Sequence, residues 1–226
     1  MIPLKDNVST RTFPIITITI VLVNILVFLW SLILADGLGH HVVHKYALIP
    51  KELLVSATLR PDLLPYNILT IFTSMFLHGG VFHLGGNMLY LWIFGNNVED
   101  AVGHSRFFLF YLLSGIAAAL VQCSVDPGSA APMIGASGAV SGILGAYLLL
   151  YPGARVKTLI FIFVFITTVD IPAVVFLSLW FLVQIIFSHG QGVAWFAHIG
   201  GFLFGLITIK IFTRGTRPRA RPRPAW

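Results

Sequence analysis

The sequence predicts an all-α membrane protein, a single bundle of six transmembrane helices. Its 226 residues are 57% hydrophobic and only 10% charged, with a mean hydropathy of +0.91. A soluble domain of this composition would leave most of its surface apolar. Several apolar runs also reach the roughly 18 residues that a helix needs to cross a bilayer.

The predicted spans follow one another along most of the chain. They cover residues 14–35, 80–97, 105–125, 137–152, 171–188 and 194–213. The first run is longer than the roughly 7–15 apolar residues of a signal peptide, so we interpret it as an uncleaved anchor. We therefore expect a cytoplasmic N-terminus over 1–13, a six-helix domain over 14–213, and a basic, Arg- and Pro-rich disordered cytoplasmic tail over 214–226.

The segment before the fifth span is the least regular. Residues 158–188 form an apolar stretch that is too long for one helix across a core of roughly 30 Å and too short for two. Asp170 and Pro172 divide this stretch, and proline favours the first turn of a helix, so the fifth span is expected to begin near Ile171. We interpret residues 157–170, which are rich in phenylalanine and β-branched residues, as an interfacial or re-entrant piece.

The basic residues indicate how the bundle is oriented. With the N-terminus in the cytoplasm, six spans leave three of these residues outside, namely Lys45, Lys51 and Arg60. The others lie inside: Lys5, Arg11, Arg106, Arg155, Lys157, Lys210, Arg214, Arg217, Arg219, Arg221 and Arg223. This bias follows the positive-inside rule and predicts that both termini are cytoplasmic. The net charge of +6 does not indicate nucleic acid, because the basic residues are not interleaved with aromatics on a folded face.

The sequence contains no motif for metal binding or for thiol chemistry. Cys123 is the single cysteine, which excludes a disulfide framework and a thiol-based metal site. The H-E-x-x-H zinc motif is absent, and no acid lies inside a predicted span where an aspartyl dyad would need it. His40, His41 and His44 lack carboxylate or cysteine partners nearby, so we interpret them as a solvated loop. We expect neither a metal nor a cofactor.

Four polar side chains inside the predicted spans are candidates for function, because polar groups at membrane depth are costly. His83 and Asn87 are four residues apart and share one helix face. Ser137 and His198 each lie near the start of a span, where backbone N–H groups are unpaired and the helix dipole is positive. Such donors would stabilise an oxyanion beside a serine nucleophile.

Ser137 and His198 meet only if their helices begin on the same side of the membrane. One crossing within residues 158–188 satisfies this condition. Close approach also requires small residues between the two helices. The small residues expected near this contact are Gly138, Ser141, Gly145, Gly201 and Gly205. They would permit the contact of roughly 2.6–3.2 Å that general-base activation of a serine needs.

Three stretches of the sequence resemble the rhomboid intramembrane serine proteases, most closely the six-span bacterial form: "TSMFLHGGVFHLGGNMLYLWIFGNNVED", "GASGAVSG" and "AHIGGFLFG". The resemblance implies that Ser137 is the nucleophile, His198 the base, and His83 and Asn87 the oxyanion-stabilising pair. It also implies a multi-pass protein of the bacterial inner membrane. Such a protein cleaves single-pass or multi-pass membrane proteins in the lipid bilayer without a metal, cofactor or nucleic acid.

Two other function classes compete with this interpretation. An inactive rhomboid-like protein would bind membrane helices, but such relatives typically lose the serine or the histidine, and this chain keeps Ser137 and His198. A small transporter would need internal repeats or ionisable residues along a path through the membrane, and neither is evident. The eight acids leave no carboxylate beside His198, so a Ser/His dyad is expected rather than a triad.

The sequence departs from the family pattern at two places. Leu69 and Thr70 stand where many relatives carry an aromatic–arginine pair or a tryptophan. Ser141 stands where some relatives stack a tyrosine against the base. Ser141 is also a second potential nucleophile, but it lies one helical turn deeper, roughly 6 Å from the helix start, and we interpret it as a packing residue. Residues 188–195 are expected to cap the site.

Overall fold

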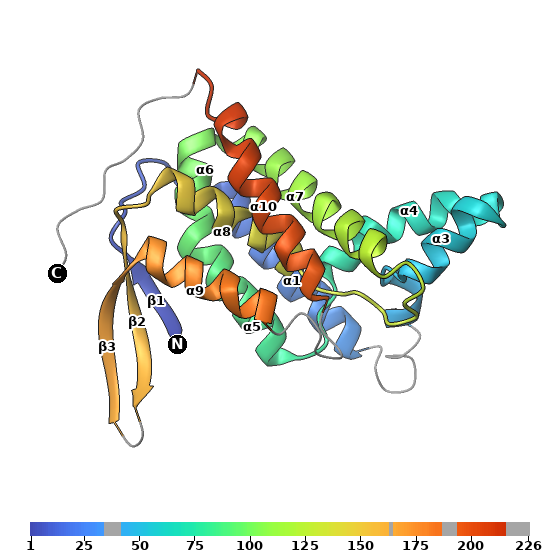
Figure 1. Ribbon diagram of the computed structural model, residues 1–226, viewed down its shortest axis with the longest axis horizontal. Coiled ribbons are helices and arrows are strands. Elements are labelled where there is room, and N and C mark those ends of the chain that lie inside the picture. Colours follow the sequence, from blue (N-terminus) through green and yellow to red (C-terminus); the bar gives the residue numbers. More distant parts are fainter. Residues whose placement is uncertain (34–41, 163–164, 187–193, 216–226) are drawn as a thin grey trace.

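The computed structural model describes residues 1–33, 42–162, 165–186 and 194–215. Most of these residues form helices, and a small antiparallel sheet lies at one end of the helical bundle (Figure 1). The cap expected over 188–195 lies almost wholly outside the described residues. So do most of the tail expected over 214–226, and His40 and His41.

The long helices are those of an integral membrane protein. Within the described residues, α1 (Ile15–Ile33), α7 (His104–Val125) and α10 (Trp195–Phe212) are each long and apolar enough to cross a membrane. A fourth candidate is a helix pair bent by 83°, Pro61–Phe76 with Val81–Val102. The remaining apolar helices, α8 (Ser137–Leu150) and α9 (Ala173–Ile186), have 14 residues each. The count of six spans therefore stays a prediction.

The chain between α1 and α7 forms short helices. First come α3 (Pro50–Thr58), η1 (Pro61–Leu63), α4 (Leu64–Thr73) and η2 (Ser74–Phe76). Leu69 and Thr70, where the sequence departs from the family pattern, lie on α4 with Leu69 exposed and Thr70 buried. Then follow α5 (Val81–Tyr90), the π-helical turn η3 (Leu91–Gly95) and α6 (Asn96–Val102), which run on as one helix with a widened turn.

The all-α prediction is wrong for two segments, which form a three-stranded antiparallel sheet. Its strands are β1 (Ile2–Asp6), β2 (Arg155–Ile162) and β3 (Phe165–Pro172), in the order β1-β2-β3. Within the piece 157–170, expected to be interfacial or re-entrant, the described residues thus form two paired antiparallel strands. Its β-branched and aromatic residues favour strands. The N-terminal segment supplies a third strand, with Ile2 opposite Leu159 and Asp6 opposite Val156.

The sheet lies at the lower left of Figure 1, beside the start of α9. The Asp6 end of β1 joins the bundle where α1 begins and α8 finishes. We call this end of the bundle, where α7 also begins and α10 finishes, the sheet end. Polar contacts hold the elements together there. The buried carboxylate of Glu99 accepts hydrogen bonds from the backbone N–H groups of Ile16 and Thr17 at 2.9 and 2.8 Å, which satisfies the first turn of α1. Asp6 accepts hydrogen bonds from Asn97 Nδ2 at 2.8 Å and from the Tyr147 hydroxyl, so β1 is tied to α6 and α8.

The opposite end of the bundle, where α8 and α10 begin and α9 finishes, is the pocket end. From the pocket end inward, helices α8 and α10 are in direct backbone contact. A Cβ atom on Gly205 would overlap the carbonyl of Gly142, and one on Gly201 would overlap the carbonyl of Gly138. Gly145 lies in the same way against the carbonyl of Phe202. This contact fixes the relative position of the two helix starts.

Candidate active site

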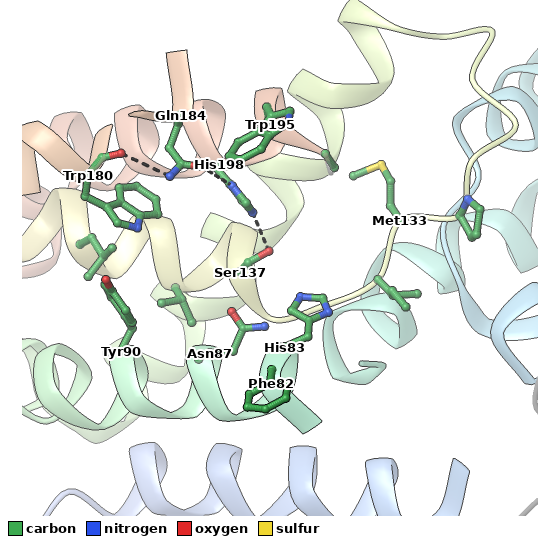
Figure 2. Close-up of a pocket in the computed structure, with 16 residues that line it drawn as sticks. Phe82, His83, Asn87, Tyr90, Met133, Ser137, Trp180, Gln184, Trp195 and His198 are labelled. Carbon is green, nitrogen blue, oxygen red and sulfur yellow. Dashed lines mark hydrogen bonds between the residues drawn. The ribbon is translucent and has the colours of Figure 1, made fainter. Parts of the chain in front are cut away.

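A cavity of about 540 Å³ opens at the pocket end between α5, α8, α9 and the start of α10 (Figure 2). Most of its lining is apolar, with side chains such as Phe82, Met133 and Leu144. The polar and aromatic side chains at its centre are His83, Asn87, Ser137, Trp180, Gln184, Trp195 and His198. All four polar residues selected from the sequence therefore line one cavity.

Ser137 and His198 are in direct contact. His198 Nε2 lies 2.8 Å from Ser137 Oγ, although 61 residues separate the two in sequence (Figure 2). The contact depends on where the two helices begin, because Ser137 is the first residue of α8 and His198 lies in the first turn of α10. Gln122 on α7 helps to place the start of α10, since its side-chain oxygen accepts a hydrogen bond of 3.2 Å from Ala197 N.

The second serine of the motif lies elsewhere. Ser141 is fully buried inside α8, and its hydroxyl donates a 2.6 Å hydrogen bond to the carbonyl of Ser137. This bond to the preceding turn is a common arrangement for serine within a helix. Ser141 is absent from the cavity lining, so the hydroxyl of α8 that reaches the cavity is that of Ser137.

His83 and Asn87 face the turn that leads into Ser137. A Cβ atom on Gly135 would lie 2.7 Å from His83 Nε2 and 3.5 Å from Asn87 Nδ2. Gly135 has a φ of 120°, a conformation that favours glycine, so both the backbone and the space at this turn require it. Both side chains come from α5 and share one face, as their spacing predicts.

The side-chain N–H donors of His83 and Asn87 on α5 face this turn. Gly79 N donates to His83 Nδ1 at 3.5 Å, which leaves His83 Nε2 to carry the ring proton. The amide nitrogen of Asn87 is buried and has no hydrogen-bond partner among the residues that the structure describes. An unpaired buried donor is costly unless a ligand satisfies it, so Asn87 is suited to bind an oxygen atom that enters the cavity.

Gln184 is a site residue that the sequence did not lead us to expect. Its side-chain oxygen lies 2.8 Å from His198 Nδ1, and its side-chain nitrogen donates to the carbonyl of Trp180 at 3.3 Å (Figure 2). The signal for it was present, because Gln184 is an amide inside the apolar run of α9, just as Asn87 is an amide inside α5. The sequence offers no acidic partner for His198, but a neutral amide also accepts a hydrogen bond.

Two tryptophans enclose the imidazole of His198. The Trp180 ring lies 6.2 Å from it, and Trp195 meets it edge to face at 5.9 Å between ring centroids. Their apolar surfaces limit the access of water to the imidazole. Within the described residues, no group of three or more His, Cys, Asp or Glu side chains is placed to hold a metal ion.

The comparison with protein families decides which family this is. The model of the Rhomboid domain matches residues 65–215, more than half of the chain. The chain belongs to the rhomboid family. This result confirms the resemblance found in the sequence, and the matched range contains α5, α8, α9 and α10, the four helices that line the cavity.

Rhomboid proteins from several kinds of organism are similar to this chain. Rhomboid protein 1, mitochondrial, of Saccharomyces cerevisiae is 30% identical over 73% of this chain and 44% of its own length. Presenilin-associated rhomboid-like protein, mitochondrial, of Bos taurus is 31% identical over 59% of this chain and 35% of its own length. Rhomboid protease GluP of Bacillus subtilis is 35% identical over 60% of this chain and 24% of its own length.

The chain therefore spans less than half the length of these rhomboid relatives. Two of the three are named as mitochondrial and one is bacterial, so they support an integral membrane protein but not the bacterial inner membrane that the resemblance implied.

Proposed function

We propose that this rhomboid-family chain is a serine endopeptidase that cleaves transmembrane segments of other membrane proteins. The observation that carries the proposal is the 2.8 Å hydrogen bond between Ser137 Oγ and His198 Nε2 inside a cavity of a membrane protein. A hydroxyl in contact with an imidazole is the arrangement that activates a serine for acyl transfer. The relative GluP of Bacillus subtilis is itself named a rhomboid protease.

Acylation uses the contact between Ser137 and His198. As Ser137 Oγ forms a bond to the carbonyl carbon of the scissile peptide, its proton passes to His198 Nε2. The carbonyl π electrons move onto the oxygen, which becomes an oxyanion. When the tetrahedral intermediate collapses, the C–N bond breaks and His198 Nε2–H gives its proton to the leaving nitrogen. The products are a free amine and an ester on Ser137.

Deacylation repeats these steps with water. His198 Nε2 takes a proton from the water as its oxygen attacks the ester carbonyl. The C–O bond to Ser137 then breaks, and His198 returns the proton to Ser137 Oγ. A carboxylic acid leaves, and the enzyme is restored.

The oxyanion is proposed to lie against the turn before α8. The donors available there are His83 Nε2, Asn87 Nδ2 and the unpaired backbone N–H groups in the first turn of α8. Preorganised donors in an apolar cavity stabilise a developing negative charge more strongly than water does, because no solvent must reorganise. The role of α5 in this account is to stabilise charge and not to activate the serine.

The substrate is proposed to be a membrane segment that unwinds locally. The carbonyls of a transmembrane helix are hydrogen-bonded within the helix, so Ser137 can attack one only after a local opening. Segments with Gly, Pro or small residues near the pocket end should therefore be cleaved best. The apolar lining of the cavity suits the side chains of such segments.

The proposed topology has six spans with both termini in the cytoplasm. Lys5, Arg155 and Lys157 lie on the strands of the sheet end, and Arg106 and Lys210 lie at the nearby ends of α7 and α10. Because cytoplasmic segments carry an excess of basic residues, the sheet end is proposed to face the cytoplasm and the pocket end the opposite side.

Cleavage of a model membrane substrate by the purified protein tests the proposed function. The wild type should release two fragments. Ser137→Ala and His198→Ala should release none above background while melting at temperatures near that of the wild type. Ser141→Ala is the matched control and should retain cleavage, because Ser141 does not reach the cavity. Turnover by a folded Ser137→Ala variant would overturn the proposal.

A further inference from the structure

We propose that Gln184 is a positioning residue that holds His198 in the tautomer able to accept a proton from Ser137. The inference rests on the proposed function and extends it from a dyad to a chain of three side chains from three helices. Gln184 lies on α9, His198 on α10 and Ser137 on α8.

The orientation of the Gln184 amide follows from its two partners. The carbonyl of Trp180 only accepts hydrogen bonds, so the side-chain NH₂ of Gln184 must face it, at 3.3 Å. The side-chain oxygen of Gln184 then faces His198 Nδ1, at 2.8 Å. An amide oxygen only accepts, so His198 Nδ1 must carry a proton in this contact.

A proton on Nδ1 determines what the other ring nitrogen can do. In a neutral imidazole only one nitrogen carries hydrogen, so His198 Nε2 presents a lone pair to Ser137 Oγ at 2.8 Å. The serine hydroxyl donates and the imidazole accepts, which is the arrangement required before attack. The opposite tautomer would place a hydrogen between Nε2 and Oγ and leave no base.

The surroundings make Gln184 the group that decides the tautomer. Gln184 is 6% exposed, so water competes little for His198 Nδ1. No acidic side chain that the structure describes lines the cavity; besides His198, the titratable side chains that do are His83 and Tyr90, both on α5. A buried carboxylate beside Nδ1 would also carry a large desolvation cost in this apolar setting, whereas a neutral amide fixes the tautomer at a lower cost.

A substitution that removes the side-chain oxygen of Gln184 but keeps the size of the side chain tests the inference. Gln184→Met is unbranched and similar in size, but it leaves His198 Nδ1 without a partner. It should lower kcat by about ten- to a hundredfold, the loss expected for one unsatisfied buried donor, with little change in KM. Gln184→Glu keeps an acceptor at the same reach and should restore kcat near neutral pH.

The pH profile separates this role from a packing role. A carboxylate at position 184 favours the protonated imidazole, so the acid limb of the kcat profile of Gln184→Glu should move to higher pH than that of the wild type. Phe181→Leu is the matched control, because Phe181 stacks on Phe202 at 4.5 Å between α9 and α10 and is absent from the cavity lining. It should reduce the melting temperature at least as much as Gln184→Met does, yet leave kcat and the pH profile near those of the wild type.

The outcomes distinguish this inference from the proposed function. If the wild type cleaves substrate and Gln184→Met keeps its kcat, the positioning role is overturned and the dyad stands. The positioning role is also overturned if Phe181→Leu loses as much kcat as Gln184→Met, or if the Gln184→Glu profile does not shift. A wild type that neither cleaves substrate nor reacts with a serine-directed probe overturns the proposed function and this role with it.

Discussion

The pair α8–α10 and the helix α9 are held in the molecule in different ways. Helices α8 and α10 touch through their backbones, with Gly145, Gly201 and Gly205 leaving no space for a Cβ atom. Helix α9 is held by aromatic side chains instead. Phe181 stacks on Phe202 at 4.5 Å and Trp180 stacks on the same ring at 6.1 Å.

This difference separates two tasks within the candidate site. Backbone contacts cannot adjust by changing rotamers, so the distance between Ser137 and His198 is fixed by the α8–α10 pair. Ring contacts hold α9 through side chains and not through the backbone, so the spacing of Ser137 and His198 depends on the more rigid of the two contacts. Close contact at glycines is the way in which membrane helices approach most tightly.

A single methyl group in the α8–α10 contact is expected to lower both activity and stability. Gly205→Ala places a Cβ against the carbonyl of Gly142, which must push the helices apart at a cost of about 1–3 kcal/mol. A shift of even 1 Å between nucleophile and base can cost about a hundredfold in rate. Substrate cleavage and the melting temperature should both fall.

Gly85→Ala on α5 is the control for this substitution, since no atom lies within 4 Å of the added methyl group. It should melt at or above the temperature of the wild type, because alanine favours helix by about 1 kcal/mol over glycine. Full activity in Gly205→Ala would show that the backbone contact does not set the geometry of the site.

Removing a donor from α5 should have a strong but more selective effect. Asn87→Ala takes away the unpaired amide that faces the turn before Ser137. Loss of one oxyanion donor typically lowers turnover by about 10²–10³-fold. The variant should still react slowly with a serine-directed probe, because the contact between Ser137 and His198 remains. If the folded double variant Asn87→Ala, His83→Ala turns over substrate like the wild type, these side chains only pack α5.

A smaller effect is expected when the rings between α9 and α10 are changed. Phe202→Leu removes the partner of Trp180 and Phe181 but keeps the backbone carbonyl that lies against Gly145. Each aromatic pair is worth about 0.5–1.5 kcal/mol beyond burial. Cleavage should fall less than tenfold, and probe labelling of Ser137 should persist. A loss as large as that of Gly205→Ala, measured at equal folded fraction, would remove the distinction between the two kinds of contact.

The smallest effect on cleavage is expected at the sheet end. Burial raises the pKa of Asp6 from 3.8 to about 6, and the hydrogen bond from the Tyr147 hydroxyl offsets part of that rise. The folded state therefore holds this proton more tightly than the unfolded state. The stability from Asp6 is fully present below pH 3.8 and is lost as the pH rises through about 6.

Melting curves between pH 4 and pH 8 measure this contribution. Asp6→Asn should flatten the decline in stability over that range by at most about 3 kcal/mol. Its cleavage rate near neutral pH should match the wild type, because Asp6 lies at the opposite end of the bundle from Ser137. An unchanged decline would place the titration on another group.

Helices that correspond to a single apolar run were predictable from the sequence. The apolar runs predicted helices that match α1, α7 and α10 within a few residues. The sheet was not predicted, because β1 comes from the far end of the chain from β2 and β3 and no local pattern reports such a partner. Gln184 was missed for a similar reason, since its place in the site depends on a hydrogen bond to His198, which lies on another helix.

The reaction of a fluorophosphonate probe, mapped to a residue by mass spectrometry, tests the central claim most directly. The claim is that the α8–α10 contact makes Ser137, and no other serine, a nucleophile. We expect one adduct on Ser137 in the wild type and in Ser141→Ala, and no adduct in Ser137→Ala or His198→Ala. An adduct on Ser141, or labelling that survives in Ser137→Ala, would contradict it.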